Sequence, residues 1–210
     1  MGASPHTPLP WLKPAVITGS LIPIAVIALR AWGNCLGADP VGQALNQLGL
    51  LALVFLIAAL GCSPLKTIVG WTWPMRLRRM LGLFAFLYAS LHVITYTALD
   101  QGFDWRAIAA DIVKRKFIFV GFLTFLLLVP LAATSTNSAV RRLGYPRWKS
   151  LHRLTYVAPT LAVVHFIWRV KRDIREPMTY AVVLTILLLV RIASHSLLPA
   201  PSSSSKLSRQ

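Results

Sequence analysis

Six apolar runs separated by short polar or basic segments dominate the pattern of this 210-residue chain. Each run has 17 to 20 residues, and a helix needs roughly 20 apolar residues to cross the hydrocarbon core of a bilayer. The first run is too long for the apolar core of a cleaved signal peptide, so we expect it to be retained. The pattern predicts six transmembrane helices, over residues 15–32, 44–61, 80–99, 117–133, 152–168 and 178–194.

Residues 100–116 follow a different pattern. Phe103, Trp105, Ile108 and Ile112 recur at near-helical spacing and are followed by basic residues, which is typical of an amphipathic helix lying in the membrane interface. We therefore predict an all-α integral membrane protein, a bundle of six transmembrane helices with one short interfacial amphipathic helix. The predicted parts are a cytoplasmic N-terminal segment, a six-helix transmembrane domain and a disordered cytoplasmic tail, over residues 1–14, 15–195 and 196–210.

Composition supports a membrane protein. Hydrophobic residues make up 56% of the chain and charged residues 13%, whereas soluble domains carry about 25% charged residues. The mean hydropathy is +0.63. Lys and Arg number 22 against 6 Asp and Glu. They stand in short clusters between apolar runs rather than on a separate basic domain, so we expect contact with membrane lipid and no nucleic-acid partner.

The number of spans and the basic residues together predict the orientation. Six spans place both termini on one side, where thirteen of the Lys and Arg residues collect, against nine on the other. Positive residues favour the cytoplasmic side, so both termini are expected in the cytoplasm. Cys35 and Cys62 then lie on opposite sides and lack a CxxC spacing, and no disulfide or metal role is expected for them.

Histidines inside apolar runs are the strongest candidates for chemistry, since ionisable groups in a membrane are costly and usually functional. His92 lies twelve residues into the third run, and His152 and His165 stand thirteen residues apart in the fifth. Both runs lead outward in the predicted topology. His92 and His165 therefore share a depth in the outer half, where two neutral imidazoles from different helices can ligate one haem iron. The alternative is a plain hydrogen bond to a neighbouring helix.

The inner position is incomplete. A histidine pairing with His152 would stand thirteen or fourteen residues before His92, where the chain has Arg79 and Arg78. His152 can therefore be a haem-associated ligand with another partner, a contact of a different cofactor, or a helix cap. His195 is a weak candidate for the missing ligand, and His6 is expected to be solvated.

Helical spacing suggests which residues surround the outer pair. Tyr88 and Tyr96 stand four residues on either side of His92, on its face. Arg169 stands four residues after His165 and close to the outer interface, where a guanidinium can pair with a haem propionate. Residues of these types in such positions are more often plain interfacial anchors.

Several separated motifs resemble the MsrQ (YedZ) family in the correct order. They are RRMLGL at 78–83, AFLYASLH at 85–92, VKRK at 113–116 running on to Gly121, PLAATS at 130–135, RLG at 142–144, WKSLHRLTY at 148–156 and HFIW at 165–168. The resemblance covers about residues 45–195.

That family belongs with the ferric-reductase-like transmembrane domains of the bacterial inner membrane. The resemblance implies haem b associated with His92, His152 and His165, a bound FMN, and electron delivery to a periplasmic molybdopterin-containing, MsrP-like subunit that reduces methionine sulfoxide in proteins. The donor would be a quinone or a cytoplasmic flavin reductase. Larger relatives carry a cytosolic FAD and NADPH module after the last span. This chain ends at Gln210, so we expect its electrons to come from elsewhere.

The resemblance suggests roles for two clusters of basic residues. At the inner face, arginines including Arg78, Arg79, Arg142 and Arg147 are candidates for the FMN phosphate, although positive-inside anchoring explains them equally well. At the outer face, Lys114, Arg115 and Lys116 depart from the charge rule and are candidates for docking an acidic partner.

Two other functions are consistent with the pattern. One is a stand-alone membrane ferric or quinone reductase acting on a diffusible acceptor. The other is a non-redox scaffold or small transporter, which is less favoured because no acidic residue lies within a span and no half-to-half repeat is evident.

Overall fold

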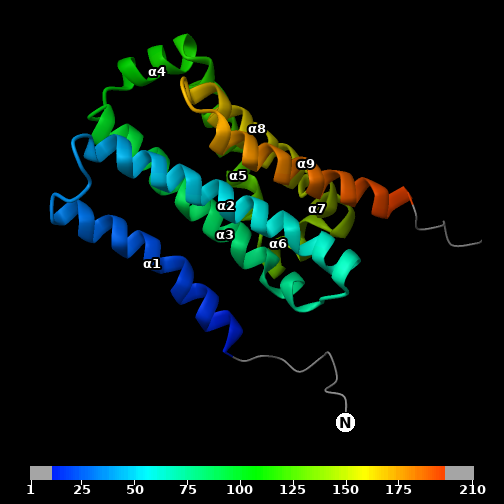
Figure 1. Ribbon diagram of the computed structural model, residues 1–210. Coiled ribbons are helices and arrows are strands. Elements are labelled where there is room, and N and C mark those ends of the chain that lie inside the picture. Colours follow the sequence, from blue (N-terminus) through cyan, green and yellow to red (C-terminus); the bar gives the residue numbers. More distant parts are fainter. Residues whose placement is uncertain (1–10, 197–210) are drawn as a thin grey trace, which may run out of the picture.

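The protein is a bundle of helices that run side by side (Figure 1). The structure, a computed structural model, describes residues 11–196, with side chains to residue 194, and every regular element in that range is helical. His6 and the side chain of His195 lie outside the described residues. The elements are α1 (Leu12–Trp32), α2 (Pro40–Val69), α3 (Trp73–Ile94), the π-helix η1 (Thr95–Asp100), α4 (Trp105–Lys114), α5 (Lys116–Ala133), α6 (Asn137–Leu143), α7 (Tyr145–Leu151), α8 (Leu154–Arg169) and α9 (Arg175–Ser196).

Within residues 11–196, five helical segments are long and apolar enough to cross a membrane. They are Leu12–Trp32, Pro40–Val69, Trp73–Asp100, Lys116–Ala133 and Arg175–Ser194. The chain is therefore a multi-pass membrane protein by the length and composition of its helices.

The predicted span over residues 152–168 differs from the observed helix. The chain turns at His152 and Arg153, so α8 begins only at Leu154 and has 16 residues. His152 ends α7 instead of opening a long helix. The predicted start of this span at His152 is wrong by two residues, because the polar His152–Arg153 step forms a turn between α7 and α8. α8 still runs along the bundle, packed on α5, α9 and α2 (Figure 1).

α2 is longer than its apolar run at both ends. Asp39 caps its start, accepting a hydrogen bond from the Gly42 N–H at 2.9 Å, and Pro40 occupies the first turn, where proline is favoured. The helix continues through Pro64 to Val69 and stops at Gly70, whose φ of +74° is left-handed. The polar Ser63–Pro64 step ends the apolar run without ending the helix.

The polar segment between the predicted spans 117–133 and 152–168 forms two short helices, α6 and α7. Thr136 caps α6 by accepting from the Ala139 N–H at 3.1 Å. Gly144, with φ +73°, separates the two helices. Each helix has seven residues, which is too short to show a clear hydrophobic period.

The amphipathic helix predicted over residues 100–116 is also shorter than expected. The third long helix continues as η1 to Asp100, and α4 begins at Trp105 after an Asp104 cap. Along α4, Ile108 is buried, while Trp105 and Val113 are exposed. α4 packs against η1 and the start of α5.

α2 lies at the centre of the bundle. Its buried residues contact α8 and α9 on one side, where Leu53, Ile57 and Leu60 meet Val163 and Leu184. On another side, Leu48 and Ala52 of α2 pack with Ile27 of α1 and Tyr88 of α3. A third cluster joins α5 to α8 through Leu128, Leu131 and Ala158. These contacts hold α2, α3, α5 and α8 in fixed register, and these four helices carry the candidate sites.

The two ends of the bundle differ in charge. The start of α1 and the end of α9 lie at the same end as α6 and α7, whereas α4 lies at the opposite end (Figure 1). All six acidic side chains of the sequence lie at the α4 end, in caps, links, short helices and the first turn of α9: Asp39, Asp100, Asp104, Asp111, Asp173 and Glu176. The end with α6 and α7 is therefore basic without compensating acids.

Candidate metal centre and charged cavity

Two histidines from different helices face each other near the α4 end of the bundle. The ring centroids of His92, on α3, and His165, on α8, lie 6.3 Å apart with the planes at 85°. Both histidines are half-buried in the bundle. The meeting of these two residues at one depth, predicted from the topology, is confirmed.

Each ring is held by a backbone carbonyl of the helix beside it. His92 Nδ1 lies 2.9 Å from the Leu45 carbonyl oxygen of α2, and His165 Nδ1 lies 2.6 Å from the Phe117 carbonyl oxygen of α5. A carbonyl only accepts, so Nδ1 carries the proton and donates it in both cases. The Nε2 atoms are then left with free lone pairs, the state in which histidine binds metals.

The spacing of the rings fits a shared metal ion. With metal–nitrogen distances of about 2 Å, two imidazoles on one ion have centroids roughly 6 Å apart. Among the described residues, no group of three or more His, Cys, Asp or Glu side chains could hold a metal. Two protein ligands alone are too few for most transition metals, whereas a haem brings four in-plane nitrogens of its own. The residues present therefore fit a haem iron.

Polar residues around the pair have partners other than the histidines. Arg169 hydrogen-bonds Asn46 on α2 and lies over the Phe166 ring at 5.6 Å. The Tyr88 hydroxyl donates to the Ser20 carbonyl at 2.6 Å, and the Tyr96 hydroxyl donates to Asp111 at 3.2 Å. The two tyrosines thus tie α1 and α4 to α3, and no hydrogen bond from either to His92 is seen among the described residues.

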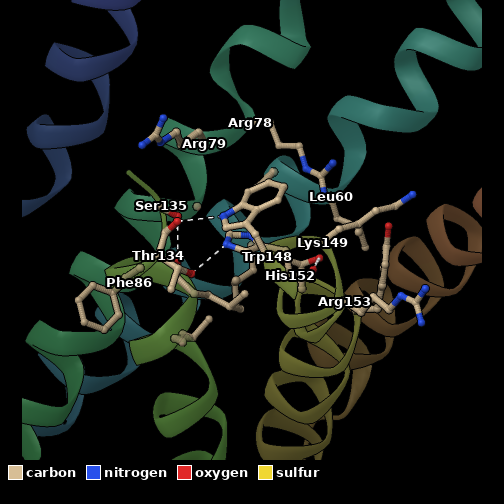
Figure 2. Close-up of a pocket in the computed structure, with 18 of the residues that line it drawn as sticks. Leu60, Arg78, Arg79, Phe86, Thr134, Ser135, Trp148, Lys149, His152 and Arg153 are labelled. Atoms are coloured by element: carbon tan, nitrogen blue, oxygen red, sulfur yellow. Dashed lines mark hydrogen bonds between the residues drawn. The ribbon is translucent and has the colours of Figure 1, made fainter. Parts of the chain in front are cut away.

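A cavity of about 660 Å³ opens at the other end of the bundle, between α2, α3 and α5 and the segment 134–156 (Figure 2). That volume is in the usual range for sites that bind small molecules. Five of its lining residues are basic and none is acidic: Arg78, Arg79, Lys149, Arg153 and Arg191. A cavity with this charge favours a phosphate or carboxylate ligand.

His152 lies in the wall of this cavity beside Trp148 and Thr134 (Figure 2). Its ring stacks on Trp148 with centroids 4.1 Å apart. The Thr134 hydroxyl donates to the Pro130 carbonyl at 2.6 Å and so accepts from His152 Nε2 at 3.0 Å. Burial, and then the charges of Arg78 and Arg79, lower the pKa of His152. Its Nε2 is thus occupied, in contrast to the free Nε2 atoms of His92 and His165.

The arginines proposed to bind FMN or a haem propionate lie in different parts of the structure. Arg78 and Arg79 line the cavity, whereas Arg142 and Arg147 are not among its lining residues, and Arg169 lies at the opposite end with Asn46. Lys114, Arg115 and Lys116 lie together where α4 passes into α5.

Several residues of the two sites were missed by sequence reasoning. Thr134, Trp148 and Arg191 line the cavity, yet each reads in the sequence as an ordinary loop or interfacial residue. The carbonyls of Leu45 and Phe117 hold the histidines, and a backbone group has no sequence signal at all. The lone glycines at 49 and 121 were the available clue, because glycine within an apolar helix often marks a close approach.

Comparison with known proteins agrees with this arrangement. The family described as "Ferric reductase like transmembrane component" matches residues 44–163, which include most of both sites. The fold and the facing histidines thus define a ferric-reductase-like transmembrane protein.

Closer relatives give the particular family. Proteins named "Protein-methionine-sulfoxide reductase heme-binding subunit MsrQ" are 50% identical in Rhodospirillum rubrum, 47% in Azospira oryzae and 43% in Deinococcus radiodurans. The matches cover 85%, 90% and 93% of this chain and 86%, 82% and 96% of those proteins, respectively. The chain belongs to the MsrQ family.

Proposed function

We propose that this chain is the haem b-binding membrane subunit of a methionine sulfoxide reductase system. It would pass electrons from the quinone pool or a cytoplasmic flavin reductase to a periplasmic, molybdopterin-containing MsrP-like subunit, which carries out the reduction and so repairs oxidised proteins. The observation that carries this proposal is the His92–His165 pair, with a 6.3 Å ring separation and both Nδ1 atoms on carbonyls. The names of the relatives support the same reading.

His92 and His165 are the proposed iron ligands. A haem bound between them would supply one-electron redox chemistry. The protein's part is to keep both imidazoles neutral, to orient them through the Leu45 and Phe117 carbonyls, and to exclude water through the surrounding helices. Arg169, held by Asn46 near the pair, is the proposed partner of a propionate.

The basic cavity is the proposed FMN site. Arg78 and Arg79 would bind the phosphate there, and the stacked Trp148–His152 pair offers an aromatic wall for a planar ring. Such a flavin would accept electron pairs from the donor and release single electrons. Arg142 and Arg147 are assigned to anchoring at lipid headgroups instead, because they do not line the cavity.

The proposed topology has α8 as a sixth crossing, with both termini in the cytoplasm and the chain in the inner membrane. The basic cavity then faces the cytoplasm and the histidine pair lies toward the periplasm. α4 is the proposed interfacial helix, since Trp105 and Val113 on its surface suit the boundary between lipid and water. Residues 1–14 and 196–210 would be cytoplasmic extensions of this domain.

Docking of the periplasmic partner is proposed at Lys114, Arg115 and Lys116. Lys116 lines a hollow of about 400 Å³ with Phe117 and Trp168, and Phe117 also supplies the carbonyl that holds His165. Arg115 is paired with Asp111 at 3.2 Å. Lys114 and Lys116 are therefore the stronger candidates for contact with an acidic partner.

Haem quantification on purified variants tests the proposal. We expect His92→Ala or His165→Ala to remove most of the haem, because either change leaves only one of the two proposed histidine ligands. We expect His152→Ala to leave a partial or altered visible spectrum, since its Nε2 bonds Thr134 in the cavity. Equal and complete loss of haem in all three variants would contradict this assignment of ligands.

A stand-alone ferric or quinone reductase is the second candidate, favoured by the ferric-reductase family match. It shares the proposed haem site and needs no docked partner. Purified protein that rapidly reduces soluble iron chelates without an MsrP-like subunit would support it, whereas reduction that depends on that subunit would support the first proposal.

A further inference from the structure

The two facing histidines are held by the same local arrangement, repeated on two pairs of helices. His92 of α3 donates to the carbonyl of Leu45, and the residue four positions later on α2 is Gly49. His165 of α8 donates to the carbonyl of Phe117, and the residue four positions later on α5 is Gly121. Each imidazole thus lies against a helical carbonyl with a glycine one turn beyond it.

Both rings approach these glycines closely. A Cβ at Gly49 would lie 3.1 Å from both Nδ1 and Cε1 of His92. A Cβ at Gly121 would lie 2.7 Å from Nδ1 and 2.8 Å from Cε1 of His165. The same edge of each ring faces the glycine. Contacts under 3 Å require something to move, so the arrangement tolerates no side chain at Gly121 and little at Gly49.

Helix geometry explains why a glycine is needed at that spacing. In an α-helix the carbonyl of residue i points toward residue i+4 and already accepts its N–H. The side chain of residue i+4 stands on the same stripe of the helix surface. A glycine at i+4 leaves the second lone pair of the carbonyl open to a donor from another helix.

We propose that Gly49 and Gly121 are positioning residues for the iron ligands. Each uncovers the carbonyl that accepts the Nδ1 proton, which keeps Nε2 free and sets the plane of the ring. This inference rests on the proposed haem function for its consequence, although the contact between glycine and histidine belongs to the protein alone. Gly121 has the larger effect, because its Cβ would come closer to the ring.

Alanine substitutions in the full-length protein test this inference. We expect Gly121→Ala to lower haem affinity by about tenfold or more, the usual effect of disturbing a group that orients a metal ligand. Gly49→Ala should keep its haem but shift the largest g value of the ferric low-spin EPR signal, which depends on the angle between the imidazole planes. Gly61→Ala is the matched control on α2, since a Cβ there meets only Leu187 at 3.9 Å.

A double-mutant cycle on haem-free protein separates this inference from the proposed function. In the presence of His165, Gly121→Ala should lower the thermal midpoint of the apo-protein. In a His165→Ala background the same change should be neutral or stabilising, because the clash is gone and alanine favours a helix over glycine. The cycle can be read even if the wild type binds no haem, and a Gly121→Ala variant that fails to fold should be rescued by His165→Ala.

Two results would overturn the inference. One is an equal effect of Gly121→Ala with and without His165, which would mean that the glycine acts through helix packing alone. The other is a Gly121→Ala protein with wild-type haem affinity and an unchanged EPR signal.

Discussion

Tyr88 is the largest polar side chain that is fully buried among the residues the structure describes. Its hydroxyl donates to the Ser20 carbonyl at 2.6 Å, and its ring stacks on Phe55 with centroids 5.2 Å apart. The hydrogen bond joins α1 to α3, whereas much of the remaining surface of α1 is exposed to the surroundings of the bundle. One hydroxyl group therefore makes a large contribution to the attachment of the first helix.

We expect Tyr88→Phe to destabilise the protein by about 1–2 kcal/mol, because a buried hydrogen bond is lost while the ring packing is kept. That corresponds to a fall of roughly 2–8 °C in the thermal midpoint. Thermal unfolding in detergent measures the change, with Tyr145→Phe as a control on an exposed tyrosine. An unchanged midpoint would mean that α1 is held by lipid contacts rather than by this bond.

Individual side chains also distinguish the three histidines. His92 and His165 place Nδ1 on carbonyls, whereas His152 places Nε2 on a hydroxyl. Spacing along the chain placed the first two at one depth, but it could not predict which nitrogen each ring would leave free. The tautomer depends on the facing backbone, and that backbone comes from a segment more than forty residues away in each of the two pairs.

The short helix α4 begins with a side-chain cap. Asp104 accepts hydrogen bonds from the N–H groups of Arg106 at 2.9 Å and Ala107 at 3.1 Å. The helix has ten residues, and a helix of that length is marginal without tertiary support. Its tertiary support comes from the hydrogen bond between Tyr96 and Asp111 and from packing of α4 on α5.

We expect Asp104→Ala to weaken α4 by about 1 kcal/mol, since the first-turn N–H groups lose their acceptor. Hydrogen exchange of residues 105–114 should then accelerate by about fivefold while exchange in α5 stays unchanged. Asp104→Asn is the matched control, because asparagine caps helices equally well. Equal acceleration in both variants would point to the charge rather than the cap.

At the scale of the whole molecule, one end of the bundle is basic and the other carries both acidic and basic residues. The two native cysteines differ in exposure and can therefore report the orientation of the bundle in the membrane. Cys35 is exposed in the link between α1 and α2, whereas Cys62 is buried in the second half of α2. The link lies at the α4 end of the bundle, which the proposed topology places in the periplasm (Figure 1).

A membrane-impermeant maleimide should therefore label intact spheroplasts at Cys35. Cys35→Ser should abolish the labelling and Cys62→Ser should leave it unchanged, because the Cys62 thiol is buried. Mass spectrometry of the labelled peptide provides the readout. Labelling that appears only after the membrane is permeabilised would invert the proposed orientation and place the basic cavity in the periplasm.

Hydropathy along the chain was sufficient to predict an all-helical membrane protein, since apolar length adds up residue by residue and needs no knowledge of neighbours. Depth follows from counting residues from the start of a span, so the meeting of His92 and His165 was predictable as well. The family was identifiable because several motifs occur in order. Helix ends were less predictable: capping by Asp39 extended α2, and a turn at His152 shortened α8.

Packing between distant segments accounts for the rest. The contacts of the Leu45 and Phe117 carbonyls, the openings at Gly49 and Gly121, and the cavity lined by Arg78 and Arg191 form only when α2, α3, α5, α8, α9 and the segment 134–156 come together. Every residue has a backbone carbonyl, so the sequence does not show which carbonyl will accept a hydrogen bond from a histidine. The absence of a side chain at a glycine matters only when a group from another helix occupies that space. The sequence pattern was therefore sufficient to predict the membrane fold and the pairing of the two histidines. Tertiary contacts with α2 and α5 determine how those histidines are held.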